Sequence, residues 1–199
     1  MKRVIAIGSA LAMLAVPAGA AAKPDHTDRV NAAKECRTER GATDATREAF
    51  VAKYGTNGNK RNAFGKCVSR RAKDEAKEGV TAHKSAVTDC KAEREALGAE
   101  AFAAKYGTGK NALGKCVSIQ AKAKEQEADA QDKEQIADRK SAAETCDEER
   151  GTTAESKAAF AEKYGTNENN RNAFGKCVSQ TAKALHQEHE DEQEDETQA

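Results

Sequence analysis

Apolar residues in this chain recur at helical spacing within short stretches, which glycines and polar residues separate. Residues 28–40 are periodic and Gly41 follows them, so we expect a first helix that stops there. Phe50 and Tyr54 stand at i and i+4, on one face of a short second helix. Gly55 is expected to end that helix in the left-handed conformation.

A third helix is predicted to begin within residues 59–62. At 100° per residue it places four side chains on one stripe: Phe64, Cys67, Val68 and Arg71. An apolar stripe that includes a cysteine predicts packing against a neighbouring helix, with the cysteine in the contact.

The pattern is repeated three times, in residues 36–69, 90–118 and 146–179. Each copy reads C-x-x-E-R, then A-F-x-x-K-Y-G-T, then N-A-[F/L]-G-K-C-V-S. The middle copy is shorter and has Leu113 where the other two have Phe. We therefore predict an all-α protein of three tandem three-helix modules.

The block F-x-x-K-Y-G-T followed by N-A-F-G-K-C-V-S resembles uncharacterised secreted bacterial proteins that carry one or more copies of it. The resemblance covers most of the chain after residue 22. It implies secretion and no particular activity.

Long polar segments connect the modules. Residues 122–140 contain Ile136 as their one large apolar side chain and have high helix propensity, so we expect a helix that bridges modules through water. The separations Cys67 to Cys90 and Cys116 to Cys146, 23 and 30 residues, differ by two helical turns. We therefore expect a rod along which the modules follow one another.

The expected organisation has five parts. They are a signal peptide in residues 1–22, module 1 in residues 23–79, module 2 in residues 80–124, module 3 with its leading connector in residues 125–185, and an acidic, disordered tail in residues 186–199.

The first residues have the layout of a signal peptide. Two cations precede the apolar run Val4 to Val16, and small residues follow, so cleavage is expected after Ala20 or Ala22. No second apolar run reaches the about 20 residues that a membrane span needs. We expect no membrane span after signal removal, and a secreted protein that is extracellular or periplasmic.

Six cysteines, an even number, favour disulfides in an oxidising compartment. Each copy has one cysteine near its start and one near its end, which predicts pairing within copies. Large apolar side chains are few, so a cross-link worth about 3–4 kcal/mol is expected to decide whether a module folds. The predicted pairs are Cys36–Cys67, Cys90–Cys116 and Cys146–Cys177.

Charge is distributed unevenly along the chain. Residues 23–79 hold 14 basic and nine acidic side chains, whereas residues 186–199 hold seven acids and neither Lys nor Arg. This polarity could align copies head to tail, or the acidic end could serve only to keep the chain in solution.

A pair of lysines seven residues apart recurs in each third helix, opposite the cysteine stripe. These lysines are either weak contacts for an anionic polymer or a solvated helix face. No aromatic residues interleave with them, so sequence-specific nucleic-acid binding is not expected. The candidate contacts are Lys60, Lys66, Lys73, Lys115, Lys122, Lys176, Lys183, Arg61, Arg70 and Arg71.

Catalytic groups do not recur as a set. The one recurrent acid is Glu39 and its equivalents, and no histidine recurs, so no catalytic residue is predicted. The recurrent Arg40 is expected to offset a helix dipole or to stack on Tyr54. His186 and His189 could bind Zn²⁺ or Cu²⁺ only weakly, and no metal site or cofactor is predicted.

These observations favour an extracellular, non-enzymatic repeat protein that binds a partner or acts as a spacer at or near the cell envelope. The partner would be an anionic envelope polymer or another protein. Two alternatives stay open: a small secreted enzyme or inhibitor that uses one module, and a stress-related secreted polypeptide without a fixed ligand.

Overall fold

The computed structural model of the chain describes residues 22–107 and 111–198, with side chains up to residue 192. These residues form seven helices and no strand, so the chain is all-α, as predicted. The helices are α1 His26–Arg40, α2 Asp44–Tyr54, α3 Ala63–Leu97, α4 Ala99–Tyr106, α5 Ala112–Arg150, α6 Ala154–Tyr164 and α7 Ala173–Gln198. Residues 1–21, nearly all of the expected signal peptide, lie outside the described part. No described helix is long and apolar enough to cross a membrane.

Each module is a pair of antiparallel helices with a short helix between them, and a disulfide joins the pair. The cross-links are Cys36–Cys67, Cys90–Cys116 and Cys146–Cys177, with Cα–Cα distances of 6.0, 6.0 and 6.1 Å. The pairing within copies is therefore confirmed. Ala32 and its equivalents, one turn before the first cysteine, are completely buried, which lets the partner helix approach closely.

Both connectors are continuous helices. α3, with 35 residues, is the third helix of module 1 and the first of module 2, and α5, with 39 residues, links modules 2 and 3 in the same way. High helix propensity carries α5 through its joining segment, and packing on α5 supports α3 across Gly79, Val80 and Thr81, which weaken its propensity.

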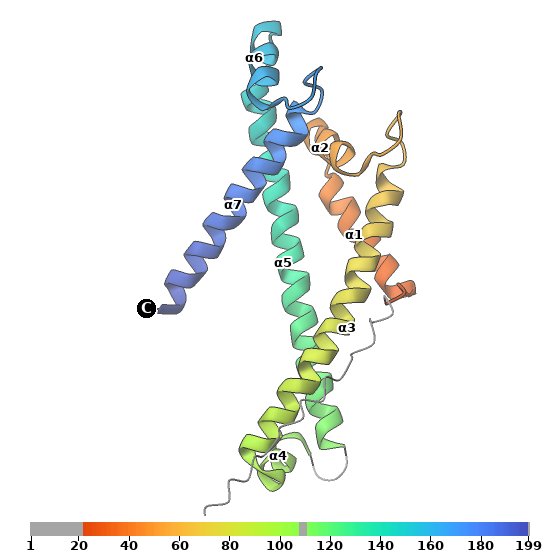
Figure 1. The fold of residues 1–199 in the computed structure, drawn as a ribbon, viewed down its shortest axis with the longest axis vertical. Helices are drawn as coiled ribbons and strands as arrows, with labels where there is room; N and C mark the ends of the chain where they lie inside the picture. The colour runs from red at the N-terminus through yellow and green to blue at the C-terminus, as the bar shows by residue number, and fades with distance from the viewer. Residues whose placement is uncertain (1–21, 108–110, 199) are drawn as a thin grey trace, which may run out of the picture.

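The spacing of the cysteines predicted that the modules follow one another along the axis, and this prediction was wrong. The chain reverses direction inside every module, so module 2 lies at one end of the elongated molecule and modules 1 and 3 lie together at the other (Figure 1). Contacts of α2 with α5 and α7 bring modules 1 and 3 together. The two-turn difference between connectors therefore does not set a step along a rod.

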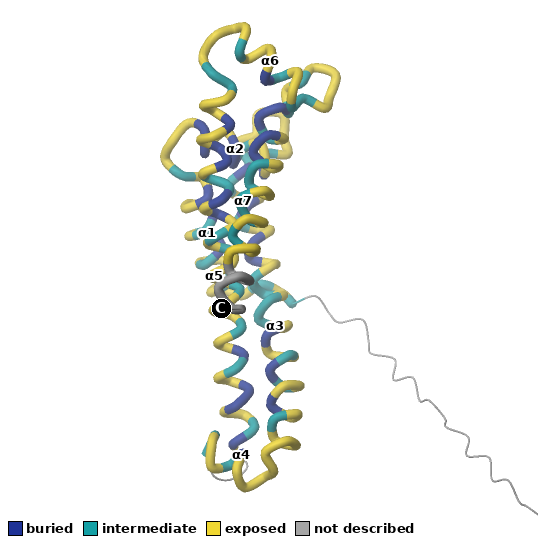
Figure 2. Tube along the Cα trace, turned by 90° about the vertical axis from the view of Figure 1, so that its left-hand side faces the viewer, coloured by how far each residue is buried: buried dark blue, intermediate teal, exposed yellow. Residues whose placement is uncertain are grey.

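The connectors pack against each other instead of crossing solvent alone. α3 lies along α5, α1 lies on α3, and α7 lies on α5. Small residues form this contact, with Ala82, Ala86 and Ala121 buried, and Ile136 is only 3% exposed. Buried and exposed segments alternate along both long helices in Figure 2. The prediction of a helix that bridges modules through water was wrong, because alanines and Ile136 supply a buried face.

Each module has a small core of its own, built around one phenylalanine of the short helix and the module's disulfide. Phe50, Phe102 and Phe160 are 2%, 1% and 4% exposed. The core of module 3 is the largest, because Phe174, Val178 and two alanines of α2 join it. In module 2, Leu113 takes the place of the second aromatic ring.

The ends of the short helices follow local sequence signals. Thr43 caps α2 by accepting a hydrogen bond from the Thr46 amide, and α1 ends at Arg40, just before Gly41. Gly41 has a φ of 61° and an added Cβ would meet the Thr46 side chain, so a larger residue would be strained there. Gly55, expected to be left-handed, has a φ of −74°.

The C-terminal segment is helical, where a disordered tail was expected. α7 continues to Gln198, and His186 and His189 face Asp138 of α5. The packing of α7 on α5 carries the helix beyond module 3.

Candidate functional site

The recurrent glutamate binds a lysine and a tyrosine at the end of the short helix. In module 1, Lys53 Nζ donates to Glu39 Oε1 at 2.7 Å and the Tyr54 hydroxyl donates to Oε2 at 2.9 Å. The corresponding pairs recur in the other modules: Lys105 and Tyr106 on Glu93, and Lys163 and Tyr164 on Glu149. This contact explains why the C-x-x-E and K-Y motifs recur together.

Module 1 carries a buried version of this cluster because α5 covers it. Arg71 lies 3.3 Å from Glu39, and Arg139 of α5 lies 3.5 Å from it. Glu39 is 3% exposed. Burial opposes its ionisation, but Lys53 and Arg71 outweigh that effect and hold the pKa of the carboxyl below its ordinary value.

The phenol and the guanidinium of this cluster are also shifted. Burial and then the Glu39 charge raise the pKa of Tyr54 well above its ordinary value. Burial would lower the pKa of Arg71, but the carboxylates of Glu39 and Asp132 outweigh it and raise that pKa. Both side chains thus stay protonated and act as fixed hydrogen-bond donors, which suits a structural role.

The recurrent arginine stands in the last turn of its helix, where a cation offsets the dipole, and it stacks on phenylalanine instead of tyrosine. Arg40 lies 5.7 Å from the ring centre of Phe64, and Arg150 lies 4.5 Å from that of Phe174. Module 2 has Leu113 in place of this ring. The tyrosine rings instead receive the lysine of the glutamate cluster, at 4.8–5.2 Å.

The candidate contacts for a polyanion differ in burial and in their position along the molecule. Arg71 is buried among Glu35, Glu39 and Asp132, so it was wrongly chosen as an exposed contact. The other nine candidates are exposed. They do not form one continuous row, because Lys115 and Lys122 lie in module 2, at the opposite end from the rest.

Modules 1 and 3 enclose a groove with an excess of positive charge. It consists of two adjoining hollows of about 760 and 280 Å³, which share Lys53 and Arg139. We call it the basic groove. Its cationic residues are Lys53, Lys60, Arg71, Arg139, Arg171, Lys176 and Lys183, and its carboxylates are Glu48 and Asp138.

Four of these cations are available for a ligand. Within the described side chains, Lys60, Arg171, Lys176 and Lys183 have no carboxylate within 4.0 Å, whereas Glu48 is already paired with Arg150. Low-dielectric walls and unpaired charges of one sign concentrate counter-ions. The groove can therefore hold an extended anion.

The groove brings together some of the residues singled out from the sequence and adds others. Lys60, Arg71, Lys176 and Lys183 were chosen as helix-face cations, and Lys53, Arg139 and Arg171 were missed. Lys53 recurs in the K-Y motif and Arg171 is the repeat equivalent of Arg61, but no local pattern shows that modules 1 and 3 meet.

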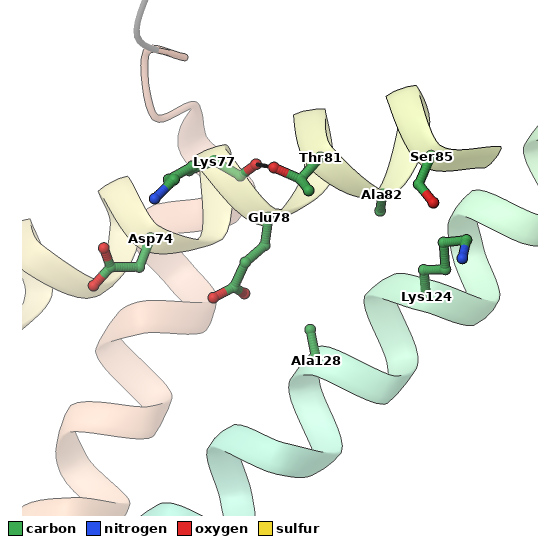
Figure 3. A pocket seen from close by; sticks show the side chains of 8 residues that line it. All are labelled: Asp74, Lys77, Glu78, Thr81, Ala82, Ser85, Lys124 and Ala128. Atoms are coloured by element: carbon green, nitrogen blue, oxygen red, sulfur yellow. Dashed lines mark hydrogen bonds between the residues drawn. The ribbon is translucent and has the colours of Figure 1, made fainter. Parts of the chain in front are cut away.

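A second groove, of about 450 Å³, lies between α3 and α5. Figure 3 shows Glu78 of α3 reaching toward Ala128 of α5, with Lys124 farther along. Its four charged residues are two acids and two lysines: Asp74, Glu78, Lys77 and Lys124. With balanced charge, this groove favours neither anions nor cations.

The two histidines of α7 face carboxylates of α5. His189 Nδ1 lies 3.3 Å from Asp138 and 3.2 Å from Glu134, and His186 Nδ1 lies 3.4 Å from Asp138. Within the described residues, no group of three or more His, Cys, Asp or Glu side chains is arranged to hold a metal ion. Through these short distances to Asp138 and Glu134, the two histidines contact α5 from α7.

Comparisons of the chain with known proteins do not point to a function. No family model matches the chain, and neither the curated proteins nor the solved structures yielded a match.

Proposed function

We propose that this chain is an extracellular, non-enzymatic repeat protein that binds an anionic polymer of the cell envelope in the basic groove. The observation that carries the proposal is the excess of unpaired cations where modules 1 and 3 meet. A polymer with regularly spaced negative charges matches an elongated groove lined from both sides.

Structural use of the recurrent polar residues supports a non-enzymatic role. The lysine and the tyrosine of each module both donate to its glutamate. The motif threonine and asparagine bind each other in modules 1 and 3, through Asn62 Nδ2 to Thr56 at 2.8 Å and the equivalent pair. Groups that are fully engaged in holding the fold are poor candidates for acid–base or nucleophilic chemistry.

Three disulfides support an extracellular site of action, because such cross-links persist in oxidising compartments. The signal-like first residues and the resemblance to secreted bacterial proteins agree with this. Module 2 then stands away from the groove at the end of α5, whose 39 residues span about 58 Å. The chain would act as both a binding unit and a spacer.

The test compares two triple variants of the oxidised full chain, which remove equal charge. The groove variant carries Lys60→Gln, Arg171→Gln and Lys176→Gln. The control carries Lys34→Gln, Lys84→Gln and Lys133→Gln, at exposed positions outside the groove. The probe is fluorescently labelled long-chain polyphosphate, and binding is measured by anisotropy at several salt concentrations.

We expect the groove variant to lose about tenfold or more in affinity and to show a shallower salt dependence, since fewer counter-ions are released. The control should stay within about twofold. Equal losses in the two variants, or no binding by the wild-type chain, would contradict the proposed site.

A further inference from the structure

Module 1 docks on module 3 through a contact between α2 and the module 3 helix pair. Arg150 Nη1 donates to both carboxylate oxygens of Glu48, at 2.9 and 2.8 Å. A Cβ added to Gly175 would lie 3.2 Å from the Ala52 Cβ, so α2 approaches α7 where α7 has no side chain. The docked helix thus needs a glutamate and small residues, and the receiving module needs an arginine and a glycine.

We name the two sides of this contact. The helix face consists of Glu48, Ala49 and Ala52 of α2. The socket consists of Arg150 and Gly175. Ala49 is 2% exposed and belongs to the core of module 3, although it lies in module 1.

The repeat places the same helix face and the same socket together in module 2. With Phe102 matched to Phe50, the helix face of module 2 is Glu100, Ala101 and Ala104 of α4. Its socket, counted from the two cysteines, is Arg94 and Gly114. All five residues are exposed.

Module 3 shows that this helix face is not a general property of the repeat. At the positions of Glu48 and Ala52 it has Ala158 and Glu162, so the charge is displaced and a bulky acid replaces the small residue. The unused helix face of module 3 is therefore unsuited to docking, whereas that of module 2 keeps the docking residues.

Module 2 also exposes larger apolar side chains beside these positions. Leu97, the last residue of α3, is 46% exposed, and Ile119 is 60% exposed. Ile119 and Gly114 line a hollow of about 540 Å³, and nothing lies within 4 Å of a Cβ added to Gly114. A Gly114 that is open in this way leaves room for a small side chain of another molecule to pack on it.

We infer that module 2 binds a second copy of this chain, with the helix face of one copy on the socket of the next. Glu100 of one copy would pair with Arg94 of the other, and Ala104 would pack on Gly114. The inference concerns the end of the molecule opposite the basic groove and does not depend on ligand binding there.

The occupant is another copy because no module of the same chain can reach this socket. Modules 1 and 3 lie at the far end of α5, about 58 Å away, and the helix face of module 1 is already used on module 3. The internal contact is one-sided, since α6 does not contact α3 within the described residues. A one-sided contact between copies joins them head to tail.

The experiment measures the mass of the oxidised full chain by sedimentation velocity from ~1 µM to ~1 mM, the range of weak protein interfaces. The variants are Arg94→Glu and Glu100→Arg, each alone and in an equimolar mixture. Gly114→Leu blocks the socket, and Gly65→Leu is its matched control at the same position of module 1, where a Cβ also meets open space.

We expect the wild-type mass to rise with concentration, each charge variant to raise the dissociation constant at least tenfold, and their mixture to restore association. Gly114→Leu should abolish association and Gly65→Leu should leave it unchanged. A monomeric wild type at ~1 mM, a mixture that stays monomeric, or an effect confined to Gly65→Leu would each overturn the inference.

Discussion

Arg71 Nη1 lies 2.7 Å from Asp132 Oδ2, across 61 residues of chain, and 2.9 Å from Glu35 Oε2. Arg71 belongs to α3, Glu35 to α1 and Asp132 to α5, so one guanidinium connects three helices. Its side chain is only 10% exposed. This contact fixes the long connector of module 3 against module 1.

Replacing Arg71 should destabilise the fold strongly. Arg71→Ala leaves three carboxylates, Glu35, Glu39 and Asp132, without their shared cation, which typically costs about 3–5 kcal/mol for a buried pair. Urea unfolding of the oxidised protein measures this loss. The control, Arg70→Ala, alters an exposed neighbour and should change the free energy of unfolding by no more than about 0.5 kcal/mol. Similar losses in both variants would show that the cation does not bind α1, α3 and α5 together.

The tyrosine of the glutamate cluster should matter more in module 1 than in module 3. Tyr54→Phe removes one donor from Glu39, a carboxylate that water does not reach, and should cost about 1.5–3 kcal/mol. Tyr164→Phe removes the same bond from Glu149, an exposed residue that water can solvate, and should cost less than about 1 kcal/mol. Thermal and urea unfolding of the two variants compare one substitution in two environments. Equal costs would contradict the difference in burial.

Loss of the module 2 disulfide should destabilise that module and leave modules 1 and 3 folded. The double variant Cys90→Ala and Cys116→Ala removes a cross-link worth about 3 kcal/mol. The core that it stabilises contains a single phenylalanine, Phe102. Hydrogen exchange should then accelerate in α4 while the amides of α2 and α6 stay protected, because modules 1 and 3 support each other. Faster exchange in all three short helices would instead indicate that the chain unfolds as one unit.

Glu75 should make the folded protein less stable as pH rises toward neutrality. Burial, together with the charges of Glu35 and Asp129, raises the pKa of Glu75 from 4.5 to about 7. A raised acid pKa means that the folded state binds the proton more tightly, so this contribution is complete below pH 4.5 and is lost as pH rises through 7.

For a half-buried group, solvent screening reduces the effect to about 1 kcal/mol, or a melting temperature about 2–4 °C lower at pH 8 than at pH 5. Glu75→Gln should remove this difference, whereas Glu144→Gln, at an exposed position of α5, should keep it. Calorimetry at the two pH values measures both, and an unchanged difference in Glu75→Gln would rule out this carboxyl as the cause.

The sequence predicted the parts of the fold that depend on near neighbours. Helix periodicity, the threonine and glycine signals at helix ends and the internal repeat determined the three-helix modules. Pairing of Cys90 with Cys116 followed from one cysteine at each end of a copy. High helix propensity predicted the connector in α5, because a helix is held by bonds between residues four apart.

The basic groove was only partly predictable. Lys60, Lys176 and Lys183 were chosen as cations on exposed helix faces, which needs nothing beyond periodicity. Arg71 was chosen with them, although periodicity placed it on the cysteine stripe, and the acids of α1 and α5 bury it there. Arg139 showed no pattern, and Arg171 was overlooked although it is the repeat equivalent of Arg61. Both become neighbours of Lys60 only when module 3 lies beside module 1.

By itself, the sequence determined three small, cross-linked helical modules and the long helices between them. The tertiary structure alone decided that the chain folds back, that modules 1 and 3 form a groove, and that module 2 stands apart. The physical reason is the range of the contacts: Glu48 and Arg150 are 102 residues apart, and no local period encodes which two distant, charged surfaces will meet.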